Sequence, residues 1–317
     1  MNEVRMRRRH LPALLALLVW TLGAVAAATA VAAGAAPTAH EVSVDGHPMR
    51  VWQKSPADAG DVAVPRVLLV HGRTWSTLPD FDLQVPGEPV SLMDGLVARG
   101  LSAYGVDLRG YGGTPRDETG WLTPERAAAD VAGVLEWLAA RDPAAPRPYL
   151  FGWSYGAMVS QLVAQQRPDL ISGVILFGYP VRPGIDRDPA EADGPPPRQP
   201  TTAQAARSDF IVPGAISERA IEAFVAAALA ADPVRADWRR LEQWRALDGT
   251  AVRVPTLLLE AEHDPLALDD VHAELFARLN TADKAWVVVP GGDHAAFMET
   301  PRDYFLDVMA TFIRGDR

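Results

Sequence analysis

The pentapeptide Gly-Trp-Ser-Tyr-Gly at residues 152–156 decides how this chain folds. A short apolar run at 148–151 precedes it, and a pattern with helical periodicity follows at 157–163. Ser154 therefore stands on a tight turn between a strand and a helix, with a glycine two residues to either side. Such a turn strains the serine backbone, and only glycine leaves room for the neighbouring chain. We expect the serine hydroxyl to be exposed at the positive end of the helix.

The composition is that of a soluble globular protein. The chain has 317 residues, 48% hydrophobic and 22% charged, which suits one large domain or two ordinary ones. Its formal net charge of −10 argues against a nucleic-acid partner. It contains no cysteine, so disulfides and thiolate chemistry are excluded. The seven histidines form no metal-binding array and no nucleotide loop is present, so we expect neither a metal nor a cofactor.

The first 35 residues have the pattern of a secretory signal peptide. Four arginines between residues 5 and 9 precede an almost wholly apolar run at 11–33, and Ala33-Gly34-Ala35 offers a cleavage site. The apolar run is also long enough to be an uncleaved membrane anchor. We expect export and cleavage near residue 35, with membrane contact only through this segment if it is retained.

The rest of the chain alternates between apolar runs and helical patterns. A hairpin is predicted over residues 41–52, around Asp45-Gly46. Further strands are predicted at 67–70, 102–106, 148–151, 174–177, 256–259 and 286–289. Continuous apolar strands separated by helices indicate an α/β fold, in which a mostly parallel, eight-stranded sheet is covered by helices on both faces. We assign this core to residues 36–180 and 251–317.

Residues 181–250 interrupt the alternation. A proline-rich stretch leads into one helix that Ser217 caps and that runs to about residue 231, and into a second predicted at 234–247. The segment could be a linker between two domains. We interpret it as an inserted helical lid, because sheet-like strands resume after it.

A serine hydroxyl needs a base to take its proton and an acid to orient that base. After Ser154, the strand at 256–259 leads into Asp264, and the strand at 286–289 leads into His294. Both segments would emerge at the same sheet edge as the serine. Glu260, Glu262 and Asp293 are alternative acids. The order serine, acid, histidine is that of hydrolases built on a nucleophile elbow.

With these motifs the chain resembles the α/β-hydrolase superfamily, as a serine esterase or lipase-like member with a helical lid. The similarity spans residues 41–315 and includes His71-Gly72 and the run from Asp107 to Gly112. It implies a catalytic triad of Ser154, Asp264 and His294. It also implies an oxyanion hole formed by the backbone N–H groups of Tyr155 and Arg73, which would stabilise negative charge on the substrate carbonyl.

Other side chains near these motifs are candidates for the substrate pocket. Trp75, Trp153 and Phe81 could line an apolar acyl site, or could belong to the core. The Arg73 side chain could favour an acidic substrate group, or could pair with Asp80 or Asp82.

These observations predict a cofactor-free, exported serine hydrolase that cleaves a small-molecule carboxylic ester through an acyl-enzyme. Four alternatives stay open at this point. The same triad serves amidases or peptidases, lactonases and acyltransferases, and the fold can also bind ligands without catalysis. Related enzymes with an aspartate in place of Ser154 act on other bonds, so the serine favours acyl transfer to water.

Overall fold

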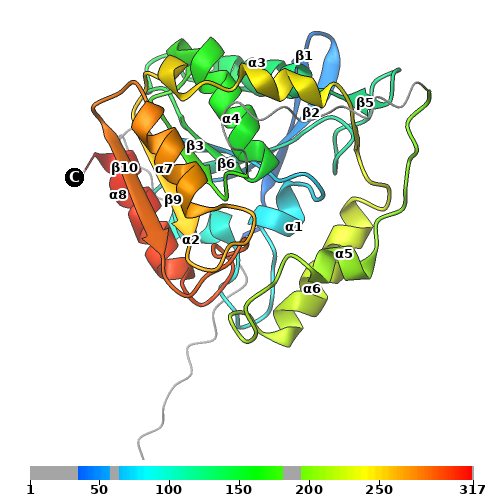
Figure 1. Ribbon diagram of the computed structural model, residues 1–317. Helices are drawn as coiled ribbons and strands as arrows, with labels where there is room; N and C mark the ends of the chain where they lie inside the picture. Colours follow the sequence, from blue (N-terminus) through cyan, green and yellow to red (C-terminus); the bar gives the residue numbers. More distant parts are fainter. Residues whose placement is uncertain (1–34, 58–63, 181–193, 316–317) are drawn as a thin grey trace, which may run out of the picture. The chain divides into compact units, whose positions relative to one another are not determined.

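The computed structural model describes residues 35–57, 64–180 and 194–315 (Figure 1). Within them, eight strands form one sheet in the order β1-β2-β4-β3-β6-β7-β9-β10. The strands are β1 Thr38–Val44, β2 His47–Lys54, β3 Arg66–Val70, β4 Ser102–Asp107, β6 Tyr149–Trp153, β7 Gly173–Phe177, β9 Thr256–Ala261 and β10 Lys284–Val289. Strand β2 pairs antiparallel with β1 and with β4, and all the other neighbours are parallel. The predicted α/β fold with a mostly parallel, eight-stranded sheet is confirmed.

Helices cover the sheet on both faces. The α-helices of the described residues are α1 Thr77–Phe81, α2 Leu92–Ala98, α3 Pro124–Arg141, α4 Tyr155–Gln166, α5 Ala203–Arg207, α6 Glu218–Ala231, α7 Asp269–Arg278 and α8 Arg302–Arg314. Helices α5 and α6 belong to the segment between β7 and β9 and lie apart from the sheet (Figure 1). Successive side chains of a strand point to opposite faces, so Leu68 and Val70 join the apolar core under α3, α4 and α7, while Val67 and Leu69 join the core under α1, α2 and α8. This double burial explains why the strands read as continuous apolar runs.

The helix starts follow the capping signals in the sequence. Thr123 accepts a hydrogen bond from the N–H of Arg126 at the start of α3, and Ser217 accepts one from Ala220 at the start of α6. None of the helices in the described part of the chain combines the length and hydrophobicity needed to cross a bilayer. The predicted signal segment, apart from Ala35, and the first part of the predicted lid, residues 181–193, lie outside the described residues.

The helix predicted at 234–247 is wrong. Strand β8 Asp237–Trp238 pairs with β5 Trp121–Leu122, and a short 3-10 helix, Leu241–Ala246, follows. Between them Arg240 has a φ of 58°, a left-handed conformation that no continuous α-helix contains. Trp238 and Trp244, which lie within the range of the predicted helix, pack against the ring of Tyr155.

The parallel strands all point their carboxyl ends to one edge of the sheet. The turns after β3, β6, β9 and β10 therefore meet there, and the segment between β7 and β9 lies beside them, with α6 packed against α1 (Figure 1). In sheets of this kind the ligand site is expected at this edge.

Candidate active site

Ser154 occupies the turn between β6 and α4 in a strained conformation, with φ 56° and ψ −120°. Its N–H donates to the carbonyl of Phe177 (2.9 Å), which fixes the turn to the neighbouring strand. A Cβ at Gly152 would lie 2.2 Å from the carbonyl oxygen of Gly156, and one at Gly156 would lie 2.2 Å from the carbonyl oxygen of Val70. The two glycines are thus required by close backbone contacts, as the motif predicts.

His294 and Asp264 form a buried pair at the same edge. The His294 Nδ1 lies 2.7 Å from Asp264 Oδ2, and the N–H of Leu266 donates to Asp264 Oδ1 (2.9 Å). Both carboxylate oxygens are therefore engaged, which orients the imidazole. Gly178 lies against this pair, since a Cβ there would come within 2.9 Å of His294 Cε1.

The alternative acids have other contacts. Glu260 accepts from Trp286 Nε1 (2.9 Å) and lies 2.6 Å from the buried His272. Glu262 is exposed and accepts from the N–H of Gly291. Asp293 accepts from the backbone N–H groups of residues 211, 212 and 295. Asp264 is the acid that contacts His294.

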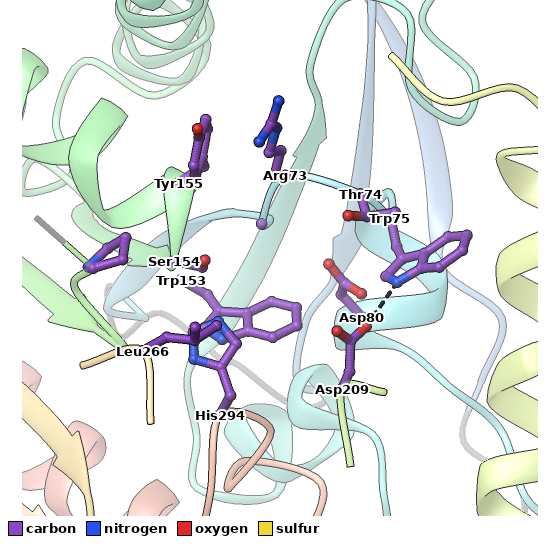
Figure 2. Close-up of a pocket in the computed structure, with 12 residues that line it drawn as sticks. Arg73, Thr74, Trp75, Asp80, Trp153, Ser154, Tyr155, Asp209, Leu266 and His294 are labelled. Carbon is purple, nitrogen blue, oxygen red and sulfur yellow. Dashed lines mark hydrogen bonds between the residues drawn. The ribbon is translucent and has the colours of Figure 1, made fainter. Parts of the chain in front are cut away.

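Ser154 and His294 line one cavity of about 320 Å³ (Figure 2). The serine hydroxyl makes no hydrogen bond to any residue that the structure describes. In structures without substrate such contacts are often long and shorten when substrate binds. Serine, histidine and acid come from three different strand ends, so the parallel sheet itself brings them together.

The backbone N–H groups of Arg73 and Tyr155 flank the cavity. Neither donates to another described residue in a turn or loop, so both remain able to bind an oxyanion. The Tyr111 hydroxyl donates to the Arg73 carbonyl, which holds the loop. The Arg73 guanidinium lies over the Tyr155 ring, 5.1 Å from its centre, and pairs with neither Asp80 nor Asp82.

His71 supports this loop from behind. It is fully buried, its Nε2 accepts from the N–H of Leu108 (3.1 Å), and its Nδ1 therefore donates to the Gly72 carbonyl (2.8 Å). Burial lowers the pKa of His71, which favours the neutral ring that these two contacts require.

The predicted pocket residues separate into two groups. Trp75 and Trp153 line the cavity, and the Trp153 ring lies 5.2 Å from that of His294. The assignment of Phe81 to the pocket is wrong: its side chain is fully buried in the core, against the rings of Phe151 and Phe297. The cavity also contains residues that the sequence analysis did not predict, because they carry no motif: Thr74, Asp80, Pro180, Asp209 and Leu266.

Carboxylates attach the segment between β7 and β9 to the core. Asp232 accepts from the N–H groups of Ser76 and Gly112 (2.8 Å each), and Asp209 accepts from Trp75 Nε1 (2.7 Å). From the core side, Asp293 accepts from the N–H groups of two consecutive residues, 211 and 212 (2.6 Å each). Burial raises the pKa of Asp232 to about 6. Asp293, the neighbour of His294, thus also holds the segment between β7 and β9 in place.

Comparisons with known proteins give the family and the fold of this chain. The biotin biosynthesis bifunctional protein BioHC of Cellvibrio japonicus is 28% identical over 278 residues, which cover 80% of this chain and 50% of that protein. The chain thus spans about half the length of this curated relative.

Solved structures with the same fold include a hydrolase from Pseudomonas aeruginosa PA01 (TM-score 0.63, 18% identity, 87% of this chain and 98% of that one). A thermophilic esterase from Thermogutta terrifontis is also similar (TM-score 0.60, 19% identity, 88% and 98%). The model of the alpha/beta hydrolase family matches residues 67–308, more than half of the chain. The chain therefore belongs to the alpha/beta hydrolase family.

Proposed function

We propose that this protein hydrolyses carboxylic esters through an acyl-enzyme on Ser154, with His294 as general base and Asp264 as the acid that orients it. The observation that carries the proposal is the buried contact between His294 Nδ1 and Asp264 Oδ2 (2.7 Å), in the wall of the cavity that holds the strained Ser154. A histidine held this way keeps its proton on Nδ1 and leaves Nε2 free to act as a base.

Acylation begins when the Ser154 oxygen attacks the ester carbonyl and His294 Nε2 takes the hydroxyl proton. The tetrahedral intermediate then expels the alcohol, which receives that proton from the imidazolium. Water attacks the acyl-serine in the second half, again with His294 as base, and releases the carboxylic acid. The Asp264 carboxylate stabilises the imidazolium that forms in each half.

The negative charge of each tetrahedral intermediate would be bound by the N–H groups of Arg73 and Tyr155. Tyr155 is the first residue of α4, so its N–H carries the positive end of the helix dipole. Loss of one such donor typically costs about 10²–10³ in turnover.

The nucleophile favours acyl transfer over the other reactions of the fold. A serine that opened an epoxide would form an ether. An ether has no carbonyl carbon for water to attack, so the serine would not be regenerated. An acyl-serine keeps that carbonyl, and the enzyme is regenerated.

We also propose that residues 181–250 form a lid that selects the substrate, and that residues 1–35 direct export. Asp209 of this segment lines the cavity, and the segment is attached to the loops around Ser154. The residues that select the substrate and those that catalyse its hydrolysis would thus line the same cavity.

The experiment is a panel of p-nitrophenyl esters with acyl chains of two to ten carbons, with matched anilides and lactones. We expect ester turnover that Ser154→Ala reduces to the level of the blank while the circular dichroism spectrum is unchanged. Retained ester turnover in that variant would refute the serine mechanism. Faster turnover of the anilides than of the matched esters would assign the protein to the amidases instead.

A further inference from the structure

Two carboxyl groups that the hydrolytic mechanism does not use line the same cavity as Ser154. Asp80 lies on α1, and Asp209 lies in the inserted segment between α5 and α6. Figure 2 shows both beside Trp75, on the side of the cavity away from Tyr155. The charge of Asp209 raises the pKa of Asp80, so the two carboxyls are electrostatic neighbours.

Asp80 has no side-chain partner among the residues that the structure describes. Its side chain is 1% exposed, and neither carboxyl oxygen has a hydrogen-bond partner among the described residues. Neighbouring carboxylates differ in this respect: Asp82 binds Lys54 Nζ (2.6 Å), and Asp107 accepts from the N–H of Thr77 and from Trp52 Nε1 (3.0 Å each). A buried carboxyl without a partner is costly, and a purely structural role would have supplied one.

The surroundings of Asp80 are acidic. Burial, followed by the charges of Asp209 and Asp232, raises its pKa well above the ordinary range, and the nearby Gly72 N–H acts in the opposite direction. Burial also raises the pKa of Asp209 to about 6, although its Oδ2 accepts from Trp75 Nε1 (2.7 Å). A positive charge in this part of the cavity would stabilise the ionised forms of Asp80 and Asp209.

The cation nearest to Asp80 in the sequence does not fill this role. Arg73 also lines the cavity, but its guanidinium lies over the Tyr155 ring (5.1 Å), and Figure 2 shows it directed away from Asp80 and Asp209. The cavity thus has an arginine stacked on an aromatic ring on one side and, on the other, two carboxyls that form no ion pair with a described residue.

We propose that Asp80 and Asp209 bind the ammonium group of a cationic ester, with the Trp75 indole beside it, and so make the cavity selective for positively charged substrates. The selectivity for cationic esters rests on the proposed ester hydrolysis, whereas binding of the ammonium group does not depend on it. An ammonium group supplies the N–H donors that Asp80 lacks and compensates the charge of both carboxyls in a site of low dielectric. The Trp75 ring adds an aromatic surface of the kind that attracts cations.

The test uses matched methyl esters that differ only at the far end of the acyl chain. Methyl 6-aminohexanoate, methyl heptanoate and monomethyl adipate end in an ammonium, a methyl and a carboxylate group, and shorter members of each series vary the distance to the carbonyl. Titration of the released acid gives kcat/KM. We expect the best ammonium ester to exceed its neutral match by about 10–100-fold, the usual range for hydrogen bonds to a charged group. An equal or lower value for every chain length, or a preference for the carboxylate, overturns the proposal.

Variants assign the selectivity to the two residues. Asp80→Asn and Asp209→Asn keep the side-chain shape, and each should lower the ratio of ammonium to neutral ester turnover by about tenfold. Asp269→Asn, the same exchange at an exposed acid at the start of α7, is the control and should leave the ratio unaltered. A ratio that falls equally in the control would reduce the effect to general electrostatics and overturn the proposal.

Calorimetry with hexylammonium and hexan-1-ol separates this inference from the proposed function. Tighter binding of hexylammonium to the wild-type protein, lost in Asp80→Asn, supports the site even if no ester is hydrolysed. Equal binding of the two probes refutes the site even if neutral esters are hydrolysed.

Discussion

Replacing Asp264 by asparagine tests the proposed roles of the acid and the histidine together. The exchange changes one oxygen to an NH₂ group, and the structure determines where that group goes. The N–H of Leu266 donates to Asp264 Oδ1 (2.9 Å), so the amide oxygen of the asparagine must take that place. Its NH₂ group then faces His294 Nδ1, where Oδ2 now lies at 2.7 Å.

An amide donor in this position exchanges the donor and acceptor roles of the two ring nitrogens of His294. Nδ1 becomes the acceptor, the ring proton moves to Nε2, and His294 can no longer take the proton of Ser154. Rotation of the amide would return the ring proton of His294 to Nδ1. It would also place the amide NH₂ group opposite the N–H of Leu266, so that two donors face each other at a cost of about 1–3 kcal/mol. Loss of the charged acceptor removes about 1.5–3 kcal/mol more from the imidazolium. Together these penalties come to about 4 kcal/mol, or about 10³-fold in kcat.

The assay is kcat on a p-nitrophenyl ester near neutral pH, with the melting temperature measured in parallel. Because the shape and the Leu266 contact are kept, the melting temperature should change little. Glu262→Gln on the same turn, an exposed carboxylate at the end of β9, is the control and should stay within about twofold of wild type, as usual for surface sites. A folded Asp264→Asn variant within tenfold of wild-type kcat would refute the reasoning.

Three other predictions concern the neighbourhood of the site and the N-terminus. Gly178→Ala adds a Cβ 2.9 Å from His294 Cε1 and should lower kcat well beyond the effect of Gly291→Ala, which shares the positive φ but has no atom within 4 Å of the added Cβ; equal losses in steady-state assays would contradict this. Burial raises the pKa of Glu299 from 4.5 to about 8, so the folded state holds its proton more tightly and stability should fall by about 2 kcal/mol from pH 6 to pH 8. Glu299→Gln should abolish that fall in urea unfolding curves, and an unchanged slope would exclude the residue as its source. If residues 1–35 direct export, N-terminal sequencing of the secreted fraction should begin near residue 36, whereas an intact N-terminus in the membrane fraction would favour an anchor.

The sequence was sufficient for the sheet and for the turns at its edge. Strands buried on both faces, such as β3 and β6, are continuous apolar runs, and the backbone contacts at Gly152 and Gly156 leave a local pattern of glycines. Spacing alone could not identify the acid, because Glu260 lies near the end of β9 and Glu262 and Asp264 follow directly after it. What separates them is which side chain reaches His294, and that depends on the turn after β9.

The acidic side of the cavity could not be predicted. Asp80 and Asp209 are 129 positions apart in the numbering, and neither belongs to a motif. They share a cavity only because the inserted segment packs over α1, a tertiary contact without local periodicity. The opposite discrepancy occurs at Phe81, which was predicted to line the pocket but lies in the core. Its neighbour Asp80 lines the cavity, while its own ring turns into the core, and adjacent positions on a short helix give no rule for which side chain points inward.

The formation of a covalent adduct on Ser154 is the most direct test of the proposed mechanism. Wild-type protein, Ser154→Ala and His294→Ala would be treated with a fluorophosphonate, and their intact masses and tryptic peptides measured alongside residual ester turnover. We predict one adduct per wild-type molecule, on the peptide that contains Ser154, with activity lost in proportion to labelling. We predict no adduct in Ser154→Ala and slow labelling in His294→Ala. Full inactivation with the adduct on another residue, or undiminished labelling of Ser154→Ala, would contradict the assignment of Ser154 as the nucleophile.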